Sequence, residues 1–554
     1  MTFATSTSSL LSSNVVFPTS VSALFLLATL FLLATAIYRV HFHPLAAIPG
    51  PWYAAVSDLW ITTHVARLQQ CTTVQSLFEK YGPVVRIGPN KIAFCDFTTM
   101  RSVYCIHKFE KSTYYKSLLT NDNDHAMTSL SNSEHAARRK PFAPHYSPSN
   151  LALFQPDIHD VTVKLTDILD RIAGKASVDC LDLFRHFSVD ILASTNFGSR
   201  PESLDLWAVN MPDPISTAVN DFPKRGVLRS AVPTWAWNLI TRIPSSRWRQ
   251  VCDSDRIMAE FVGEKLHHMR ARMLAGKAIG DIDTEKMPLL QRLLQHRVFA
   301  TNEGMSDQNI VSEAMGHLIA GVDSTSTTIS YFLWELSRRP DIVAKLQTEI
   351  DDAMPDRRVV PDISILSSLP YLNAFIKEGL RLYGAAPSLL ERVVPERTSS
   401  PVSSADQDFD MMGYALPPGT IVSTQAWSMH RAAEVFPSPE TFLPDRWIAV
   451  DQSEAEEERL MRCVLLLEFV FIRIEPDECR MAQHMMPFGA GTRICGGQAL
   501  AHIVLKILVA AMVRNFNISA NASETNERTM AIKDAFITLP AGMECKLSFT
   551  TRAQ

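Results

Sequence analysis

The chain has 554 residues, of which 53 are lysine or arginine and 58 are aspartate or glutamate, so its formal net charge is −5. This balance gives no sign of the basic surface that nucleic-acid-binding proteins carry. The nine cysteines are odd in number, irregularly spaced and without a Cys-x-x-Cys pair, which argues against a disulfide scaffold and for a reducing compartment. Length alone favours two to four domains.

The amino-terminal region contains an apolar run that is long enough to cross a bilayer. Residues 21–38 read VSALFLLATLFLLATAIY, and no charged residue occurs before Arg39. With the six preceding residues the run reaches the roughly 20 that a membrane-spanning helix needs. The positive-inside tendency predicts a luminal tail over 1–20, a transmembrane anchor over 21–38 and a cytosolic remainder. A cleaved signal peptide is the alternative, because residues 34–36 (ATA) resemble a cleavage site.

A proline-rich segment follows the apolar run. It contains His43-Pro44-Leu45 and then Ile48-Pro49-Gly50-Pro51. Because proline fixes φ and lacks an N–H donor, this segment cannot continue the helix. Residues 39–52 are therefore predicted to form a stiff, kinked hinge between the anchor and a catalytic part over 53–554.

A basic helix is predicted further along the chain. Residues 131–140 (SNSEHAARRK) are expected to form a short helix that ends before the following proline. His135 and Arg139 are four residues apart and share one helix face. Arg138 and Lys140 are expected to face outward, toward an acidic redox partner. An ordinary solvated face is the alternative interpretation of this segment.

The longest predicted helix runs from about Ser306 to Arg339. Residues 320–325 in its middle read AGVDST, and the first two carry almost no side chain, so a flat cofactor and dioxygen can approach the backbone. The hydroxyl of Ser324 can bond the carbonyl of Ala320, four residues earlier, and open the helix locally. Asp323 beside it can relay protons. The alternative is ordinary packing of small residues.

A glycine-rich loop near the carboxyl end surrounds one cysteine. Residues 488–497 read FGAGTRICGG, and these small residues let amide N–H groups point at the sulfur of Cys495. Arg493 supplies a cation for a nearby anionic group. These features are typical of a cysteine thiolate that ligates haem iron. The alternative is a buried structural cysteine in a glycine-rich turn.

The pattern F-G-x-G-x-R-x-C-x-G is matched without a gap, and the chain resembles the cytochrome P-450 family, the haem-thiolate monooxygenases, of the microsomal fungal kind. The resemblance runs from the proline hinge near residue 48 to the end of the chain. It implies a mainly α fold with small β-sheets and one haem-thiolate domain behind the transmembrane helix, in place of several domains. It also implies the endoplasmic reticulum membrane, with a cytosolic catalytic domain.

The resemblance implies a role for each motif, with haem b as the cofactor and Cys495 as the iron ligand. The other cofactor-binding residues would be one aromatic and four mostly propionate-facing basic residues: Phe488, His135, Arg139, Arg392 and Arg493. A buried network that supports folding would join the E-x-x-R pair to the Pro-Asp-Arg-Trp segment through Glu378, Arg381 and Arg446. Proton delivery would fall to Asp323, Ser324 and Thr325. The family usually has threonine directly after the acid, so Ser324 predicts looser coupling of oxygen use to product.

One segment does not fit the resemblance. Between Trp447 and Pro487 the chain is about twenty residues longer than the family usually is, and the excess centres on Cys463–Arg480, CVLLLEFVFIRIEPDECR. Its 18 residues correspond to a nucleotide length that is a multiple of three, so an intron of this length would keep the reading frame. The codons at its two ends can contain intron splice sites. We hypothesise a translated, unspliced intron. A genuine insertion that forms an extra hairpin is the alternative.

By resemblance, substrate specificity lies in Tyr114–Asp124, the upstream part of the long helix, Ala385–Leu389 and Phe536–Ile537. These segments are mostly apolar and aromatic, which predicts a lipophilic small molecule, with a fungal secondary metabolite as the family's implication. Electrons would come from NADPH through a separate NADPH–cytochrome P-450 reductase, and O2 would be the co-substrate. One alternative is a haem-thiolate isomerase or dehydratase that needs neither oxygen nor a reductase. The other is a non-catalytic haem- or lipid-binding membrane protein.

Overall fold

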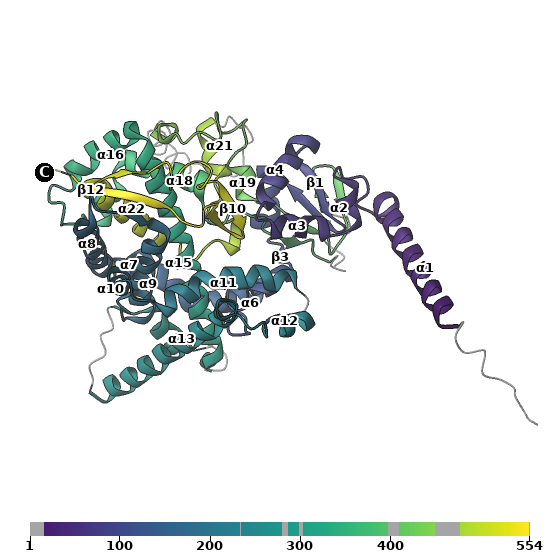
Figure 1. Cartoon of the computed structure of the whole chain (residues 1–554), viewed down its shortest axis with the longest axis horizontal. Helices are drawn as coiled ribbons and strands as arrows, with labels where there is room; N and C mark the ends of the chain where they lie inside the picture. Colours follow the sequence, from purple (N-terminus) through teal and green to yellow (C-terminus); the bar gives the residue numbers. More distant parts are fainter. Residues whose placement is uncertain are drawn as a thin grey trace, which may run out of the picture.

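The structure is a computed structural model that describes residues 16–232, 234–279, 286–297, 303–396, 409–448 and 477–552. A body of helices with small sheets occupies most of it, and one long helix, α1, projects from the body (Figure 1). This arrangement confirms the predicted mainly α fold. Most of the suspected insertion Cys463–Arg480 lies outside the described residues.

Helices form most of the molecule. The described α-helices, in chain order, are α1 (Val16–Ile37), α2 (Trp52–Val56), α3 (Leu59–Ala66), α4 (Gln70–Tyr81), α5 (Phe97–Arg101), α6 (Asn132–Phe142), α7 (Pro148–Ala152), α8 (Gln155–Ile172), α9 (Cys180–Phe197), α10 (Ser203–Ala208), α11 (Pro214–Ala231), α12 (Thr234–Ile240), α13 (Ser246–Ile279), α14 (Leu289–Gln295), α15 (Asp307–Arg338), α16 (Pro340–Ala353), α17 (Ile363–Ser367), α18 (Pro370–Tyr383), α19 (Ala426–Met429), α21 (Asp477–His484) and α22 (Gln498–Asn515). Shorter 3₁₀ or π segments are η1 (Tyr38–Phe42), η2 (Ser102–Ile106), η3 (Thr113–Leu118), η4 (Ala143–Tyr146), η5 (Pro444–Trp447) and η6 (Gly491–Arg493).

Among the described residues, four small sheets accompany the helices. The described strands are β1 (Val84–Gly88), β2 (Lys91–Phe94), β3 (Glu110–Lys111), β4 (Ser177–Asp179), β5 (Arg392–Val393), β6 (Phe409–Met411), β7 (Tyr414–Leu416), β8 (Ile421–Ser423), β9 (Phe516–Ser519), β10 (Ile532–Ala535), β11 (Ile537–Pro540) and β12 (Lys546–Thr551). The largest sheet has the order β1-β2-β8-β5-β3, with β2 and β8 parallel. A three-stranded sheet has the order β4-β12-β9, and β10-β11 and β6-β7 form two hairpins. The sheets therefore tie distant segments together around the helical body.

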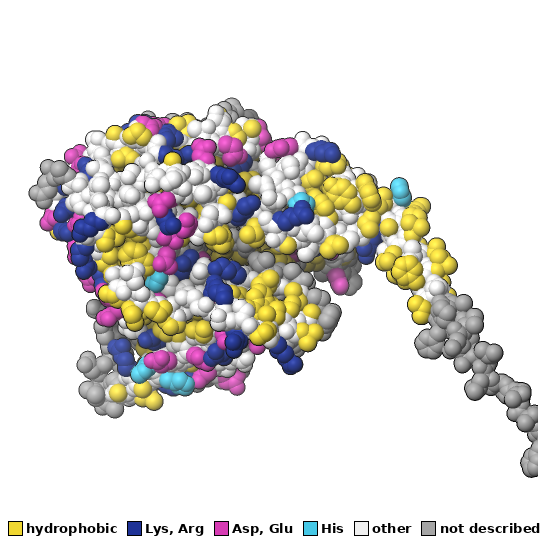
Figure 2. Space-filling view, in the orientation of Figure 1, with side chains coloured by type: hydrophobic (Ala, Val, Ile, Leu, Met, Phe, Trp, Pro, Cys, Tyr) yellow, Lys and Arg dark blue, Asp and Glu magenta, His cyan; other side chains and the backbone are white. Residues whose placement is uncertain are grey.

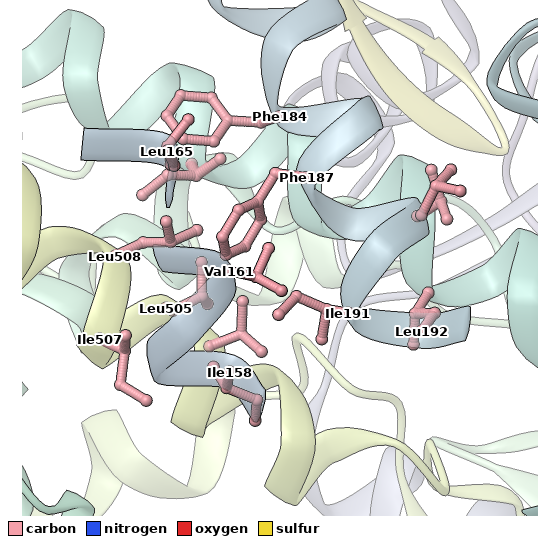
Figure 3. Close-up of a cluster of buried hydrophobic side chains, with 14 of the residues drawn as sticks. Ile158, Val161, Leu165, Phe184, Phe187, Ile191, Leu192, Leu505, Ile507 and Leu508 are labelled. Atoms are coloured by element: carbon pink, nitrogen blue, oxygen red, sulfur yellow. The ribbon is translucent and has the colours of Figure 1, made fainter. Parts of the chain in front are cut away.

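The long helix α15 crosses the centre of the body and matches its predicted bounds. Ser306 caps it by accepting a hydrogen bond from the amide of Asn309 (3.3 Å), and Pro340 opens the next helix, α16, where its missing N–H costs nothing. Most side chains of α15 from Ile310 to Leu336 are buried. Apolar side chains of α8, α9 and α22 pack together in the same core (Figure 3). This packing holds α15 in place along its length.

The basic helix α6 begins as predicted but ends later. Ser131 is its N-cap and accepts a hydrogen bond from the amide of Glu134 (3.2 Å). The helix continues through Pro141 to Phe142, so the prediction that it ends before the proline is wrong. A proline in the last turn removes a single backbone donor, and the helix ends one residue later.

The amino-terminal helix is apolar and largely exposed, as expected for a segment that is covered by lipid (Figure 2). Residues Val21–Phe42 are long and apolar enough to span a membrane. The helix α22 passes the same test, but 61 % of it is buried inside the core, which explains its composition. Helical structure continues through η1, and thus ends later than the predicted start of the hinge at residue 39.

The proline hinge is docked against the body. Leu45 and Ile48 are buried in a core cluster of their own. The amide of Arg86, on β1, donates to the carbonyl of Pro49 (2.8 Å), and its guanidinium donates to the carbonyl of Arg39 (2.8 Å). These contacts hold the hinge, and with it the end of η1, against the body.

Candidate active site

The loop around Cys495 has a backbone that only glycine permits at two positions. Gly489 and Gly491 have φ of +79° and +70°, a region that side chains disfavour. A Cβ built on Gly491 would lie 2.0 Å from the carbonyl oxygen of Tyr104. The amide of Cys495 donates to the carbonyl of Phe488 (2.9 Å) and closes the loop. The glycines of the motif are therefore required by the fold of this loop.

The sulfur of Cys495 lies at the amino-terminal end of α22. Burial raises the pKa of the Cys495 thiol, whereas the amides of Gly497 and Gln498 and the charge of Arg139 lower it. Cys495 is nevertheless exposed to solvent, in contrast to the buried Cys71. Amide donors, a nearby cation and a helix amino terminus all favour negative charge on this sulfur. It can therefore act as a thiolate ligand.

Helix α6 packs against the cysteine loop through Arg139. Its Nη1 donates to the carbonyls of Ile494 (2.9 Å) and Thr492 (3.3 Å), one and three residues before the cysteine. His135, on the predicted shared face, is buried. Burial, with Arg493 as the next cause, lowers the pKa of His135 to about 4, so the imidazole is neutral at neutral pH.

Arg138 does not face outward, and its predicted role toward a redox partner is wrong. Its Nη2 donates to Oδ1 of Asn309 (3.1 Å), and its Nη1 lies 3.7 Å from Oε2 of the buried Glu313. The physical reason is that a buried carboxylate on α15 attracts the guanidinium. Lys140 is exposed, as predicted.

Basic side chains gather on one side of the cysteine loop. Arg493 donates to the carbonyls of Ser129 (2.9 Å) and Leu130 (2.8 Å), and burial followed by the charge of Arg392 lowers its pKa to about 10. Arg392 is buried on β5 and donates to the hydroxyl of Tyr115 (3.4 Å). The sequence-predicted Arg392 and Arg493 are thus brought together.

The basic cluster fits a dianionic ligand. It consists of Lys111, His135, Arg139, Arg392 and Arg493. In the part of the chain that the structure describes, none of the five forms an ion pair; their acceptors are carbonyls and a phenol. Four of these groups are cations, whereas His135 is neutral, and clustered cations repel one another unless an anion joins them. The donor set therefore suits the two carboxylates of a haem, and the predicted Phe488 lies at the same loop, with its ring beside His502 (5.1 Å between centroids).

The acid and alcohol of α15 have the predicted local geometry. The hydroxyl of Ser324 donates to the carbonyl of Ala320 (2.6 Å), which confirms that prediction. Asp323 is buried, with Oδ1 3.6 Å from Nε of Arg185 on α9. Burial raises the pKa of Asp323 to about 6 although Arg185 opposes the shift. Thr325, the third predicted residue, is half-buried. A carboxyl group that titrates near neutrality suits proton transfer.

Tyr146 connects the cysteine loop with α15. Its hydroxyl is hydrogen-bonded to Nδ1 of His317 (2.8 Å), one turn before Ala320. A Cβ built on Gly497 would lie 3.8 Å from the Tyr146 ring and 3.9 Å from the sulfur of Cys495. The cysteine loop and the AGVDST segment of α15 therefore meet in the same region of the molecule.

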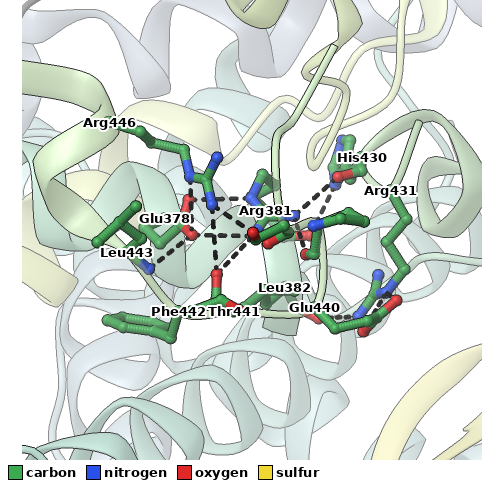
Figure 4. Close-up of polar contacts among 12 residues, drawn as sticks. Glu378, Arg381, Leu382, His430, Arg431, Glu440, Thr441, Phe442, Leu443 and Arg446 are labelled. Atoms are coloured by element: carbon green, nitrogen blue, oxygen red, sulfur yellow. Dashed lines mark hydrogen bonds and ion pairs between the residues drawn. The ribbon is translucent and has the colours of Figure 1, made fainter. Parts of the chain in front are cut away.

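The three predicted network residues converge on one buried carboxylate (Figure 4). Arg381 donates to both oxygens of Glu378 (2.8 and 2.9 Å), and Nε of Arg446 donates to Oε1 (3.2 Å). The indole of Trp447 and the amide of Leu443 complete the set of donors (both 2.9 Å). Side chains of Glu378 and Arg381 are fully buried. This geometry is that of a structural ion-pair network.

The segments predicted to set substrate specificity lie side by side. The rings of Tyr114 and Phe536 are 6.4 Å apart, and the amide of Thr538, on β11, donates to the carbonyl of Ala385 (2.8 Å). The hydroxyl of Thr120 is bonded to the carbonyl and hydroxyl of Ser312 on α15 (2.9 and 2.8 Å). Thr120 thus contacts α15 through polar groups, whereas Tyr114 and Phe536 meet through their rings.

Two residues that the sequence did not single out belong to this region. Glu313 is buried on α15, accepts from the amide of Ala126 with both oxygens (3.1 Å each) and has Nε2 of His317 at 3.5 Å. The second residue is Arg185, which forms the ion pair with Asp323. Asn309, Ser312, Glu313 and Gly316 share one helix face by their spacing, a signal that could have marked Glu313. No local signal pairs Arg185 with Asp323.

Comparison with known proteins identifies the family. A profile of the cytochrome P-450 family matches residues 48–547. The chain is 26 % identical to tryprostatin B 6-hydroxylase of Aspergillus fumigatus, covering 90 % of this chain and 79 % of that one. It is 25 % identical to fusicoccadiene C-8 hydroxylase of Alternaria brassicicola (91 % and 90 % covered) and 26 % identical to cytochrome P-450 monooxygenase notG' of Aspergillus versicolor (90 % and 82 % covered). The chain belongs to the cytochrome P-450 family and is a haem-dependent monooxygenase.

Proposed function

We propose that Cys495 ligates the haem iron and that the chain hydroxylates a lipophilic secondary metabolite. One observation carries the ligand assignment: the sulfur faces the amides of Gly497 and Gln498 at the start of α22, in a loop whose shape requires glycine at two positions. His135, Arg139, Arg392 and Arg493 hold the cofactor's carboxylates, and Phe488 packs at its cysteine side. Bound haem supplies the chemistry of dioxygen activation and insertion of one oxygen atom.

The protein's own contribution to the reaction is proton delivery and positioning. Asp323 carries a proton below about pH 6, and Arg185 lies 3.6 Å from its carboxylate. Ser324 passes that proton on, because its oxygen can accept from the acid while its own proton leaves the Ala320 carbonyl. Thr325, the next residue of the helix, supplies a second hydroxyl group. Glu378, Arg381 and Arg446 keep the fold rigid and take no part in the chemistry.

The substrate is proposed to be a lipophilic molecule held by aromatic side chains. Support comes from Tyr114 and Phe536, whose rings lie together, and from Ala385–Leu389 beside them. Two relatives are named as hydroxylases, one of tryprostatin B and one of fusicoccadiene. A terpenoid, polyketide or indole product is therefore the expected class.

We also propose that the chain is anchored in the endoplasmic reticulum by residues 21–38, with 1–20 in the lumen, 39–52 as the hinge and 53–554 as the cytosolic catalytic domain. The apolar helix ending at Phe42 supports this topology. Electrons from NADPH would arrive through a separate NADPH–cytochrome P-450 reductase, because the sequence contains no flavin-binding unit.

The decisive experiment is the carbon monoxide difference spectrum of reduced microsomes that contain the full chain, followed by turnover with NADPH and the reductase. A strongly red-shifted Soret band is expected, and Cys495→Ser should abolish it. Oxygen consumption that depends on substrate and NADPH would then establish the monooxygenase. Turnover without NADPH would favour an isomerase or dehydratase, and haem binding without oxygen consumption under any substrate would favour a binding protein.

A further inference from the structure

Lys111 is a buried lysine that no sequence motif singled out. It lies on β3 with 8 % of its surface exposed, directly opposite Arg392 on β5 in the antiparallel register. Opposite residues of paired strands project to the same face of a sheet, and like charges at such positions repel each other. An anion that bonds both side chains would offset this repulsion.

Lys111 also lies next to Arg493 of the cysteine loop. The carbonyl of Leu130 accepts both from the backbone amide of Lys111 (3.2 Å) and from Nη2 of Arg493 (2.8 Å). The ammonium group stands 4.2 Å from the centroid of the Tyr115 ring, whose hydroxyl accepts from Arg392. Lys111 is therefore placed between the two arginines. Burial, Arg392 and Arg493 all lower its pKa.

Lys111 forms hydrogen bonds with the far end of the segment that follows it, residues 112–129. Its backbone amide donates to Leu130, and its ammonium group donates to the carbonyl of Met127 (2.6 Å). The residues in between, 112–129, include the predicted specificity segment Tyr114–Asp124. A cation at this place can thus contact an anion beside the cysteine loop and, through another of its three donors, hold the specificity segment.

We propose that Lys111 is a further cofactor-binding residue: its ammonium group binds a haem carboxylate between Arg392 and Arg493, and its bond to Met127 couples cofactor binding to the order of residues 112–129. This proposal rests on the proposed haem-thiolate site. It explains why two buried cations, Lys111 and Arg392, lie beside the half-buried Arg493 although none of the three forms an ion pair with a carboxylate of the described residues.

The test compares cofactor release from full-length holoprotein variants to an excess of apomyoglobin. Lys111→Met is expected to release haem at least about tenfold faster, the worth of a charge-assisted hydrogen bond, whereas Lys111→Arg stays within about threefold of wild type. Lys140→Met, which removes an exposed lysine of α6, is the matched control and should release haem at the wild-type rate. An unchanged rate in Lys111→Met would overturn the proposal.

A second measurement separates charge recognition from simple damage to the fold. Protein reconstituted with haem dimethyl ester, which lacks the two charges, should release it equally fast in wild type and Lys111→Met. In the apoprotein, Lys111→Met should not lower the unfolding midpoint, because removing the lysine relieves repulsion from Arg392. Equal acceleration for haem and its ester, or a destabilised apoprotein, would show a merely structural role.

Hydrogen exchange tests the coupling to the specificity segment. Amides of residues 113–129 should exchange more slowly with haem than with the dimethyl ester in wild type, and this difference should vanish in Lys111→Met. A difference that persists would overturn the coupling. Failure of the wild-type chain to give the carbon monoxide band would instead refute the proposed haem-thiolate site, so the two failures are distinguishable.

Discussion

Ser324 occupies the position where the family usually has threonine, and its hydroxyl bonds the carbonyl of Ala320. Threonine would keep this bond but restrain the side-chain rotamer through its methyl group. We expect Ser324→Thr to raise the yield of product per NADPH and Ser324→Ala to lower product formation about tenfold. Product, hydrogen peroxide and NADPH should be measured together. An unchanged yield in Ser324→Ala would mean that another group delivers the proton.

Asp323 should give the enzyme a pH dependence near 6. Burial raises its pKa from 3.8 to about 6, so the folded state holds this proton more tightly than the unfolded state. Its contribution to stability is therefore present below about pH 4 and is lost as the pH rises to about 6, on the order of 3 kcal/mol in total.

Asp323→Asn should remove that slope and lower the rate of product formation by about a hundredfold, because the carboxyl proton is missing. Chemical denaturation from pH 4.5 to 7.5 measures the slope, and product formation over the same range should show an inflection near 6 in wild type only. An inflection that persists in Asp323→Asn would assign it to another group.

At the scale of elements, Glu378 holds α18 against η5 and the preceding loop. Both of its oxygens accept charged or amide donors, and its side chain is fully buried. Glu378→Gln should lower the free energy of unfolding by about 3–5 kcal/mol, because Arg381 would be left as an uncompensated buried charge. Glu260→Gln, in the i,i+4 pair with Arg256 in which both side chains are exposed (65 % and 59 %), is the control and should cost less than about 1 kcal/mol. Equal effects would argue against a buried network.

The contacts that Glu313 makes with Arg138 and with the amide of Ala126, two residues after the specificity segment, give another prediction. Glu313→Gln should destabilise the protein by about 2 kcal/mol, because Arg138 would lose its buried partner. The double variant Glu313→Gln/Arg138→Gln should recover part of this loss. Urea titration measures the free energy of unfolding, and hydrogen exchange of the Ala126 amide reports whether its bond to residue 313 persists. A double variant less stable than either single one would show that the two side chains act independently.

Interactions within one helix were predictable from the sequence, whereas those between distant segments were not. The bond from Ser324 to Ala320 and the pairing of Glu378 with Arg381 follow from helical spacing. Arg185 reaches Asp323 only because α9 packs beside α15, more than a hundred residues later in the chain. The partner of Arg138 was missed for the same reason. Helix ends were misjudged at Pro141, where the last two residues of α6 are buried, and at Phe42, where helical structure continues through the exposed η1.

At the scale of the whole molecule, the anchor can be tested by glycosylation. Asn517 and Asn521 lie in exposed sequons on the body. With the body in the cytosol neither should be modified, whereas a sequon placed on an extension before Met1 should be. A shift in gel mobility that endoglycosidase removes would report modification of the natural sequons or of the added one. Glycosylation at Asn517 would place the body in the lumen and contradict the proposed topology.

The suspected intron bears on whether the body folds around its cofactor. Cys463–Arg480 ends inside α21, and the residues after it are held by the body: Met481 and Met485 pack with Trp447 and Phe436. The amide of Met486 donates to Nε2 of His430 (2.8 Å). These contacts lie beyond the deleted residues, so removing Cys463–Arg480 should leave them in place.

We therefore expect the deletion variant to load at least as much haem as the full chain. The ratio of the carbon monoxide band to total protein measures loading, and sequencing the transcript across the junction tests its origin. A deletion of the eighteen residues that abolishes the band, together with abundant message that contains all eighteen codons, would show a genuine structural insertion.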